Sequence, residues 1–420
     1  MRYINRSIQL KLNEMNGKLP VILLTGARQT GKSTLLEYIR NSGNKKINYV
    51  TLDNLIERAN AIEDPENFLR MHETPLVIDE FQYAPNLLSY IKIEVDEARK
   101  NEMFGDGKEV ETMYYLTGSQ VFQTMKNVSE SLAGRIGILE LNPLSTREIN
   151  KMQEDCFIPD IKLLKNREKI AYEPVRKIFE RILKGSYPIL YNGQENSLEN
   201  FYSAYIKTYI ERDIRQLINI KDEVKFLKFI SAVAARTGQE YNASDIGKDV
   251  GIDNKTVDEW MSILKNTFLV YLLQPYSNNV VSRVIKRPKI YFMDTGLACY
   301  LAGYLSSETL EKSIYSGAIF ETYVISEIIK SYVNSAKDPR QHLYYFRDNN
   351  GTEIDLLIVY EDNIYPVEIK KGANPGKEAV KNFNIVEKFE LNFPNGIVIC
   401  LSKEIHALDE KNYIIPIEYL

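Results

Sequence analysis

The stretch "VILLTGARQTGKSTLLEYI" constrains the fold of this chain more than any other. Four apolar residues, Val21 to Leu24, predict a buried strand, and the apolar residues after Ser33 recur at helical spacing. Between them lies the pattern G-x4-G-K-S, a glycine-rich loop leading from a strand into a helix. Such a loop closes backbone N–H groups around phosphate oxygens, and the helix N-terminus favours their negative charge. The sequence therefore predicts an α/β domain that binds a nucleotide phosphate.

The residues of this loop have distinct predicted roles. Lys32 is expected to reach the β- and γ-phosphates, and Ser33 to ligate Mg²⁺ through its hydroxyl. The alternative is a chance match in a glycine-rich loop, and the flanking strand and helix argue against it. The predicted nucleotide-binding set is Gly26, Ala27, Arg28, Gln29, Thr30, Gly31, Lys32, Ser33 and Thr34.

A second apolar run, "PLVIDEFQ", ends in two adjacent carboxylates. Leu76 to Ile78 predict a buried parallel strand, and the carboxyl ends of such strands lie where α/β sheets bind ligands. Asp79 is expected to hold Mg²⁺, and Glu80 to act as the base that orients the attacking water. An isolated Asp-Glu pair more often marks a strand that reaches solvent, so this interpretation depends on the neighbouring phosphate-binding loop.

Two further stretches contribute candidate residues to the same domain. "MYYLTGSQ" predicts a strand that ends in the hydroxyls of Thr117 and Ser119, which could sense the γ-phosphate. "SLAGRIGILEL" places Arg135 directly before another strand-like run. This arginine either stabilises transition-state charge on the nucleotide of a neighbouring subunit, which requires a homo-oligomer, or caps the preceding helix at the surface.

Four of these motifs together carry a family resemblance. "GARQTGKSTLL", "LVIDEFQ", "LTGSQ" and "SLAGR" resemble the AAA+ branch of P-loop ATPases in bacteria and archaea. They are similar in particular to a family whose ATPase core is joined to a carboxy-terminal restriction-endonuclease-like domain. The resemblance implies ATP binding and hydrolysis with Mg²⁺, Thr117 or Ser119 as a sensor, and Arg135 as a finger residue.

The middle of the chain predicts helices and a helix–turn–helix. "FYSAYIKTYIERDIRQLINI" has tyrosine and isoleucine residues at helical spacing, which indicates a packing surface rather than a base-stacking platform. "SDIGKDVGIDNKTVDEWMSIL" predicts two helices that meet at Gly251, with Asp253 or Asn254 capping the second. A strand-like run follows, so the whole module has the winged-helix pattern.

The charged residues of this module and of the run after it favour different functions. The second helix carries Asp258 and Glu259 against two lysines, which favours a structural use over base reading. The run that follows the module is basic, and it predicts either a wing on a phosphate backbone or a solvated strand edge. Its cations are Arg283, Lys286, Arg287 and Lys289.

The stretch "GTEIDLLIVYEDNIYPVEIKKG" predicts a β-hairpin with three charged side chains on one face. If Asp362 and Asn363 form a two-residue turn, Asp355 pairs with Lys370. Glu368 lies two residues before Lys370, so the three charges share a face. This matches a D…E-x-K nuclease pattern, in which Asp355 and Glu368 bind Mg²⁺ and Lys370 orients or activates water. The alternative is a wet hairpin face with cross-strand ion pairs.

A preceding helix supplies one more candidate ligand. In "SGAIFETYVISEIIKSYV", Glu321 shares an apolar helix face with Ile325 and Ile328. A buried carboxylate needs a partner or a metal, so Glu321 could complete the metal shell; the helix dipole alone is the alternative. Helix, strand, "EIDLLI" and "VEIKKG" in this order resemble the restriction-endonuclease-like fold, although Ile354 stands where many such nucleases have proline.

Composition excludes several other classes of protein. Three widely spaced cysteines argue against a disulfide framework or a zinc site and favour a cytoplasmic protein. No run of about 18 apolar residues is present, so no membrane partner is expected. The formal net charge of −4 over 420 residues neither favours nor excludes nucleic acid.

The sequence thus predicts an α/β chain of four parts. These are an AAA+ P-loop ATPase core (1–150), a helical lid (151–225), a winged-helix module (226–304) and a restriction-endonuclease-like α/β domain (305–420). The expected function is Mg²⁺-dependent ATP hydrolysis coupled to a nuclease-like domain that acts on DNA. The alternative is a signalling or scaffold ATPase whose carboxy-terminal domain binds nucleic acid or protein without cleaving it.

Overall fold

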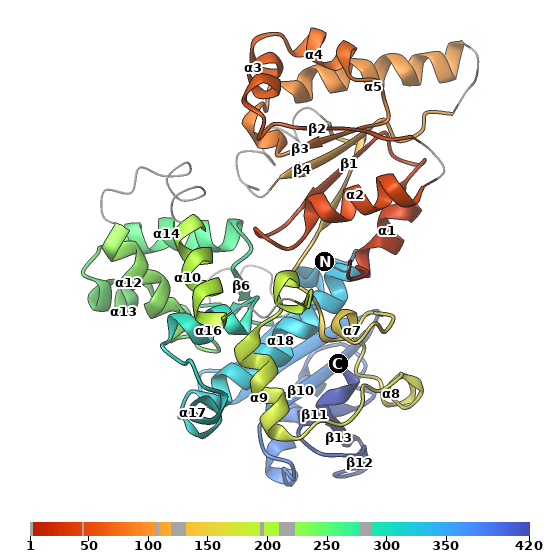
Figure 1. Cartoon of the computed structure of the whole chain (residues 1–420). Coiled ribbons are helices and arrows are strands. Elements are labelled where there is room, and N and C mark those ends of the chain that lie inside the picture. The colour runs from red at the N-terminus through yellow and green to blue at the C-terminus, as the bar shows by residue number, and fades with distance from the viewer. Residues whose placement is uncertain are drawn as a thin grey trace.

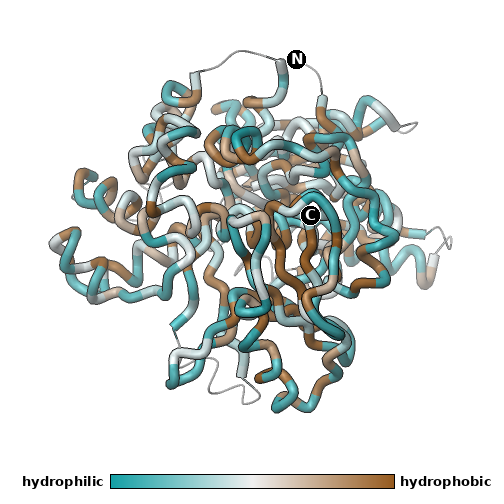
Figure 2. The backbone as a smooth tube through the Cα atoms, turned by 90° about the horizontal axis from the view of Figure 1, so that it is seen from below, coloured by the Kyte–Doolittle hydropathy of each residue, from teal (hydrophilic) through white to brown (hydrophobic). Residues whose placement is uncertain are grey.

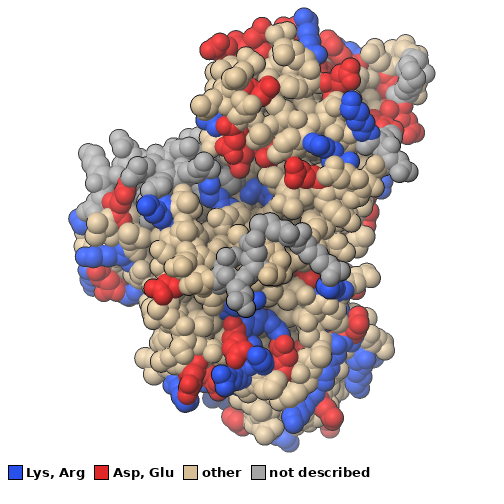
Figure 3. Space-filling view, viewed as in Figure 1, with Lys and Arg blue, Asp and Glu red and all other residues tan. Residues whose placement is uncertain are grey.

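A computed structural model describes residues 3–43, 46–105, 107, 109–118, 132–193, 197–209, 223–277 and 287–420. Figure 1 shows an upper α/β domain above a larger lower body, with the long helix α18 (Ser316–Asn334) where the two meet. None of the helices in these ranges is both long and apolar enough to cross a lipid bilayer. On the face shown in Figure 3, Asp and Glu are spread over the upper domain, whereas Lys and Arg gather on the lower body.

Five parallel strands form the sheet of the upper domain, in the order β2-β3-β4-β1-β5. They are β1 (Val21–Thr25), β2 (Asn48–Thr51), β3 (Leu76–Asp79), β4 (Tyr114–Gly118) and β5 (Ile136–Glu140). Alternate residues of β1 face opposite sides, so Val21 and Leu23 belong to one core. Ile22 and Leu24 belong to the other. Both faces of the sheet are covered, which explains the continuous apolar runs in its strands.

Helices cover the two faces of this sheet. Those on one face are α1 (Ile8–Met15) and α2 (Lys32–Ser42), and those on the other are α3 (Leu55–Glu63), α4 (Pro65–Met71) and α5 (Leu87–Phe104), with the short turn η1 (Phe81–Tyr83) after β3. Side-chain caps start α3 and α4. Asn54 accepts a hydrogen bond from the N–H of Ile56 at 2.9 Å, and Asp64 precedes Pro65 in the favoured first helical position.

One hydrophobic core runs through the lower body, from Phe157 to Leu420. The helices in the middle of the chain are α7 (Thr146–Ile149), α8 (Ile161–Asn166), α9 (Val175–Lys184), α10 (Leu198–Tyr209), α12 (Glu223–Ala234), α13 (Ala243–Val250), α14 (Asn254–Asn266), α16 (Thr295–Leu301) and α17 (Ser307–Lys312), with the turn η2 (Pro188–Tyr191). The boundaries predicted at 225 and 304 fall inside this core. Buried side chains of α8, α9 and α10 belong to it, so the described part of the expected lid packs into the lower body.

Two details of the middle region follow the sequence pattern. Tyr202 and Tyr205 of α10 are buried in the core, which confirms the tyrosine stripe as a packing surface. Helices α13 and α14 meet at Gly251, and Asp253 caps α14 by accepting from the N–H of Thr256 at 2.9 Å. The strands β6 (Val270–Leu273) and β7 (Lys289–Phe292) then pair antiparallel. The winged-helix identity of this module stays a prediction.

A six-stranded mixed sheet forms the carboxy-terminal part, in the order β12-β13-β11-β10-β9-β8. Its strands are β8 (Leu343–Arg347), β9 (Glu353–Tyr360), β10 (Asn363–Lys370), β11 (Gly396–Cys400), β12 (His406–Ala407) and β13 (Asn412–Pro416), joined by the turns η4 (Pro339–Gln341), η5 (Lys377–Val380), η6 (Phe383–Lys388) and η7 (Ile417–Tyr419). Helix α18 packs on one face, and η5 and η6 pack on the other. Figure 2 shows the apolar strands beside the carboxy terminus.

The β9–β10 hairpin turns one residue earlier than predicted. Asn363 pairs with Tyr360, so Glu361 and Asp362 form the turn. Glu361 adopts a φ of 53°, the left-handed conformation that a tight hairpin turn needs. Moving the turn by one residue shifts the cross-strand pairing by two, which leaves each side chain on the same face of the sheet.

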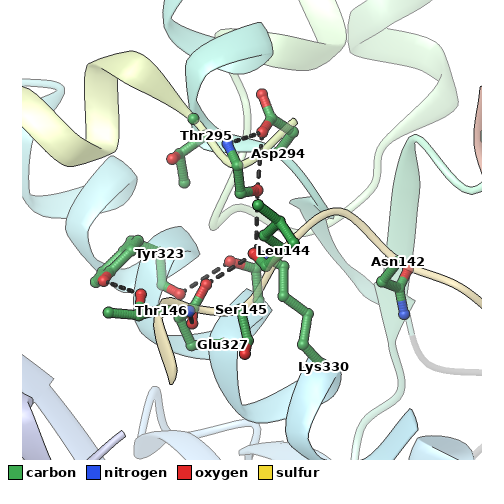
Figure 4. Close-up of polar contacts among 12 residues, drawn as sticks. Asn142, Leu144, Ser145, Thr146, Asp294, Thr295, Tyr323, Glu327 and Lys330 are labelled. Atoms are coloured by element: carbon green, nitrogen blue, oxygen red, sulfur yellow. Dashed lines mark hydrogen bonds and ion pairs between the residues drawn. The ribbon is translucent and has the colours of Figure 1, made fainter. Parts of the chain in front are cut away.

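Buried polar contacts join the two parts of the molecule at α18 (Figure 4). The N–H of Thr146, at the start of α7, donates to Glu327 Oε2 at 2.6 Å. Lys330 Nζ donates to Glu327 Oε1 at 2.8 Å and to the carbonyl oxygen of Leu144 at 3.1 Å. It also donates to Ser186 Oγ at 3.1 Å. The segment that leaves the upper sheet is therefore bonded directly to the helix that supports the carboxy-terminal sheet.

Candidate functional site

The glycine-rich loop lies at the carboxyl end of β1 and leads into α2. Gly31 caps that helix with a φ of 93°, and Gly26 has a φ of 141°. A Cβ atom at Gly26 would lie 2.2 Å from the carbonyl oxygen of Leu141, so a side chain does not fit there. Lys32 Nζ donates to the carbonyl oxygens of Gly26 at 3.0 Å and Ala27 at 2.8 Å. The ammonium group thus lies over the loop that is predicted to bind phosphate.

The other predicted loop residues differ in their exposure. Thr30 is fully buried and donates from Oγ1 to the carbonyl oxygen of Ala27 at 2.9 Å. Gln29 is exposed with a φ of 59°, and Arg28 is half-buried. Thr34 is exposed on the first turn of α2. Bonds within the loop therefore hold its shape, while part of it stays open to solvent.

Asp79 is the centre of a cluster of hydroxyl groups. Ser33 Oγ donates to Asp79 Oδ1 at 2.8 Å, and Thr117 Oγ1 donates to the same oxygen. Tyr49 OH donates to Asp79 Oδ2 at 2.8 Å. The structure thus brings together Ser33, Asp79 and Thr117 from three separate motifs.

Glu80 directly follows this cluster in a left-handed backbone conformation, with a φ of 56°. Non-glycine residues in this region concentrate at functional sites. The N–H of Glu80 donates to Thr117 Oγ1 at 3.1 Å, and its carboxylate accepts from Gln82 Nε2. Burial raises the pKa of the Glu80 carboxyl, while Gln82 and Lys32 lower it. A raised pKa makes this carboxylate a better proton acceptor near neutral pH.

The groups present at this site fit a nucleotide with Mg²⁺. Hydroxyl and carboxylate oxygens are the ligands that Mg²⁺ takes, and Ser33 and Asp79 offer one of each in direct contact. Lys32 and the N-terminus of α2 supply positive charge beside them. No side chain fits at Gly26, and a glycine at this position lets the loop backbone approach a phosphate closely.

Arg135 lies far from the loop of its own chain. The N–H of Val21 donates to the carbonyl oxygen of Arg135, which places this arginine at the amino ends of the parallel strands. The loop lies at the opposite end of β1, about 16 Å away at the rise of a strand. Arg135 Nε donates to Asp96 Oδ1 at 2.6 Å, and this contact lowers the pKa of Asp96. Any role of Arg135 at a nucleotide therefore needs a second molecule.

Ser119 lies outside the described residues.

The carboxy-terminal candidates meet on one face of the hairpin. Lys370 Nζ lies 2.5 Å from Glu368 Oε1 and 3.9 Å from Asp355 Oδ2. Asp355 is nearly buried and accepts from the N–H of Ile369 at 2.9 Å. Burial and the Asp355 charge raise the pKa of Glu368 to about 8. The predicted pairing of Asp355 with Lys370 is wrong, because Val367 pairs with Leu356, a register two residues away from the predicted one. The shared face of the three charges is confirmed.

Glu321 is already paired with groups of the middle module. Its Oε1 accepts from Tyr291 OH at 2.6 Å and lies 3.4 Å from Lys289 Nζ. Lys289 is 3% exposed and also pairs with Glu353 at 2.6 Å. Burial and the charge of Asp355 raise the pKa of Glu321 to about 7. Both roles expected for Lys289, in a wing and at a solvated edge, are wrong, because this lysine is buried among carboxylates. Arg283 and Lys286 lie outside the described ranges.

The acidic residues do not form a complete metal-binding set. Within the described ranges, no group of three or more His, Cys, Asp or Glu side chains is placed to hold a metal ion. Glu321, Asp355 and Glu368 are therefore not brought into one ligand set. A groove of about 510 Å³ opens beside Glu368, and its lining includes Lys370, Lys371 and Lys381. Three lysines and the carboxylates of Glu368 and Glu378 thus line this groove.

Two residues of the nucleotide site escaped the sequence analysis. Tyr49 comes from β2, and only the pairing of β2 with β3 brings it to Asp79. Arg6 precedes every motif, yet it donates to the carbonyl oxygen of Thr30 at 2.6 Å. The apolar pattern of β2 could have suggested the first contact, whereas nothing in the sequence near Arg6 indicates the second.

Known families cover three parts of the chain. Residues 18–150 match the model of an AAA domain. Residues 175–308 and 316–420 match models described as domains of unknown function, DUF8612 and DUF4143. The match at 316–420 names no fold, so the restriction-endonuclease-like resemblance stays a prediction.

Similar whole proteins are found in bacteria and archaea. The chain is 26% identical over 373 residues to an uncharacterized protein of Mycobacterium tuberculosis, covering 88% of this chain and 74% of that protein. It is 21% identical over 400 residues to an uncharacterized protein of Methanocaldococcus jannaschii, covering 89% and 80%. The Walker-type ATPase of Pyrococcus abyssi aligns with a TM-score of 0.44 and 16% identity, over 71% of this chain and 96% of that one. Residues 18–150, by their family match and their site geometry, form an AAA-type ATPase domain.

Proposed function

We propose that the upper domain binds and hydrolyses ATP with Mg²⁺. The observation that carries this proposal is the contact of Ser33, Asp79 and Thr117 beside the phosphate-binding loop. Ser33 and Asp79 would hold Mg²⁺, which supplies charge neutralisation to the phosphates when bound. Thr117 keeps the Asp79 carboxylate oriented, and Lys32 binds phosphate oxygens.

Glu80 is the base in this proposal. Its carboxylate accepts a proton from water as the water oxygen bonds to the γ-phosphorus. The bond from that phosphorus to the bridging oxygen breaks, and ADP leaves with the electron pair. The raised pKa of Glu80 suits it to take the proton, and its contact with Gln82 holds the carboxylate in place.

The test of ATP binding is the replacement Lys32→Ala. Because the variant loses charge-assisted hydrogen bonds to phosphate, we expect Mg²⁺–ATP affinity to fall about 10- to 100-fold by calorimetry. Lys11→Ala, which removes a lysine paired with Glu14 on the surface of α1, should leave affinity within about twofold. Equal affinities for wild type and Lys32→Ala would contradict the assignment of the loop.

For the carboxy-terminal domain we infer a nuclease-like action on DNA that is controlled by the nucleotide state. Asp355, Glu368 and Lys370 share one face, and a groove bordered by lysines opens beside them. Two carboxylates can take a divalent cation, and a lysine can stabilise the charge that develops when water attacks a phosphodiester. Lysines along the groove favour a polyanion.

The opposing proposal is a scaffold whose carboxy-terminal domain binds nucleic acid or protein without cleavage. It is favoured by Lys289, which already supplies a buried cation to Glu321 and Glu353. With that lysine in place, Glu321 has its charge compensated without any metal.

Cleavage of DNA with Mn²⁺ and ATP separates these two proposals. The nuclease proposal expects Asp355→Ala to remove all cleavage, because a ligand oxygen is lost. Asp362→Ala, at the turn of the same hairpin, should cut as wild type does. If wild type cuts neither single- nor double-stranded DNA nor RNA, the scaffold proposal stands.

A further inference from the structure

Arg6 connects the phosphate-binding loop to two other segments of the chain. Its Nη1 donates to the carbonyl oxygen of Thr30, and its Nη2 to the carbonyl oxygen of Asn142, each at 2.6 Å. Its Nε lies 3.2 Å from Glu148 Oε1. All three nitrogens of the guanidinium group are therefore used, and Arg6 is only 5% exposed.

The partners of Arg6 are themselves held in place. Glu148 accepts from the N–H of Ser7 at 2.7 Å and forms a capping box with Ser145 at the start of α7. Asn142 lies in the segment between β5 and the buried polar contacts of Figure 4. The guanidinium group is thus anchored on two sides, and its third contact is the loop.

The bond from Arg6 to Thr30 holds one end of the Thr30–Gly31 peptide unit in the predicted phosphate-binding loop. The carbonyl of Thr30 and the N–H of Gly31 belong to one planar peptide unit and point in opposite directions. Gly31, with a φ of 93°, offers little resistance to rotation of this unit. A fixed Thr30 carbonyl therefore fixes the direction of the Gly31 N–H, one of the donors available to a phosphate.

We propose that Arg6 is a positioning residue for nucleotide binding, which it serves by locking the Thr30–Gly31 peptide. This inference rests on the proposed ATPase function. A guanidinium group is needed because its planar fork reaches three acceptors at once, whereas the ammonium group of lysine is a compact point charge.

The experiment compares Arg6→Lys with Arg147→Lys. Arg147 is also buried and donates to backbone carbonyl oxygens, those of Gln153 at 2.7 Å and Glu168 at 3.0 Å. Neither acceptor belongs to the loop. We expect Arg6→Lys to raise the KM for ATP about tenfold, with kcat within about threefold of wild type. We expect both variants to lower Tm by similar amounts, because each loses a buried guanidinium group. Arg147→Lys should leave the KM for ATP within about twofold of wild type.

A second measurement uses the wild-type protein alone. A non-hydrolysable ATP analogue with Mg²⁺ should slow amide hydrogen exchange at Ser7, because coupling between two sites is reciprocal. Unchanged exchange there, or equal KM values for the two lysine variants, would overturn the role of Arg6. A wild-type protein that binds no analogue would instead overturn the ATPase proposal.

Discussion

Glu80→Gln should lower the rate of phosphate release about 10²- to 10⁴-fold. Glutamine keeps the size of the side chain and can still contact Gln82, but it cannot accept a proton from water. ATP binding should persist, because Lys32, Ser33 and Asp79 are unchanged and Glu80 donates to Thr117 only through its backbone. Steady-state phosphate release and calorimetric ATP affinity together measure this separation of binding from chemistry.

The control for Glu80 is Glu66→Gln. Glu66 is an exposed glutamate of α4 that pairs with Arg70, and its replacement should leave the rate within about twofold. A Glu80→Gln enzyme that hydrolyses ATP at the wild-type rate would show that another group takes the proton. A variant that loses affinity as well would show that Glu80 serves mainly to shape the site.

Lys330→Met should destabilise the protein by about 3–5 kcal/mol. Lys330 and Glu327 have side chains only 2% and 5% exposed, so the variant leaves a buried carboxylate without its cation. The carbonyl oxygen of Leu144 and Ser186 Oγ each lose a donor as well. Methionine fits the space of the lysine stem, so the loss reflects charge and hydrogen bonding. Urea unfolding followed by circular dichroism measures it.

An exposed pair on α17 provides the matched control. Lys312 lies 2.8 Å from Glu308, both side chains are more than two-thirds exposed, and Lys312→Met should leave the urea midpoint close to that of wild type. Adding Glu327→Gln to Lys330→Met should recover part of the lost stability, because the unpaired charge is removed. No recovery in this double variant would mean that the hydrogen bonds to the upper domain dominate.

Sequence reasoning located the nucleotide site because its signals are local. Strand β1, the loop and α2 follow one another within about twenty residues, and each has its own pattern. The carboxylates of β3 were recognisable because an apolar strand ends there. The contact of Tyr49 with Asp79 was not predictable, since it depends on which strands are neighbours in the sheet.

The carboxy-terminal site shows a different limit. The face shared by Asp355 and Lys370 survived an error in the turn, because side chains alternate with a period of two. Strand alternation gives no information about which residue pairs with Glu321. Lys289 lies 32 residues earlier on β7, and only the packing of that strand against α18 brings the two charges together. Local charge composition suggested a solvated lysine, and tertiary packing buried it.

Helix α18 has a consequence for how the chain can be divided. Glu321 and Glu327 are six residues apart on it, about 9 Å along one rigid axis. The first carboxylate lies beside Lys289, which also pairs with Glu353 of the hairpin, and the second bonds the segment leaving the ATPase sheet. The family match at 316–420 begins at this helix, yet Lys330 of α18 bonds Leu144 and Ser186, which lie in earlier segments. A fragment cut at that limit would expose the Glu327–Lys330 pair and the part of the core that earlier segments cover, so we expect it to be less stable than the full chain.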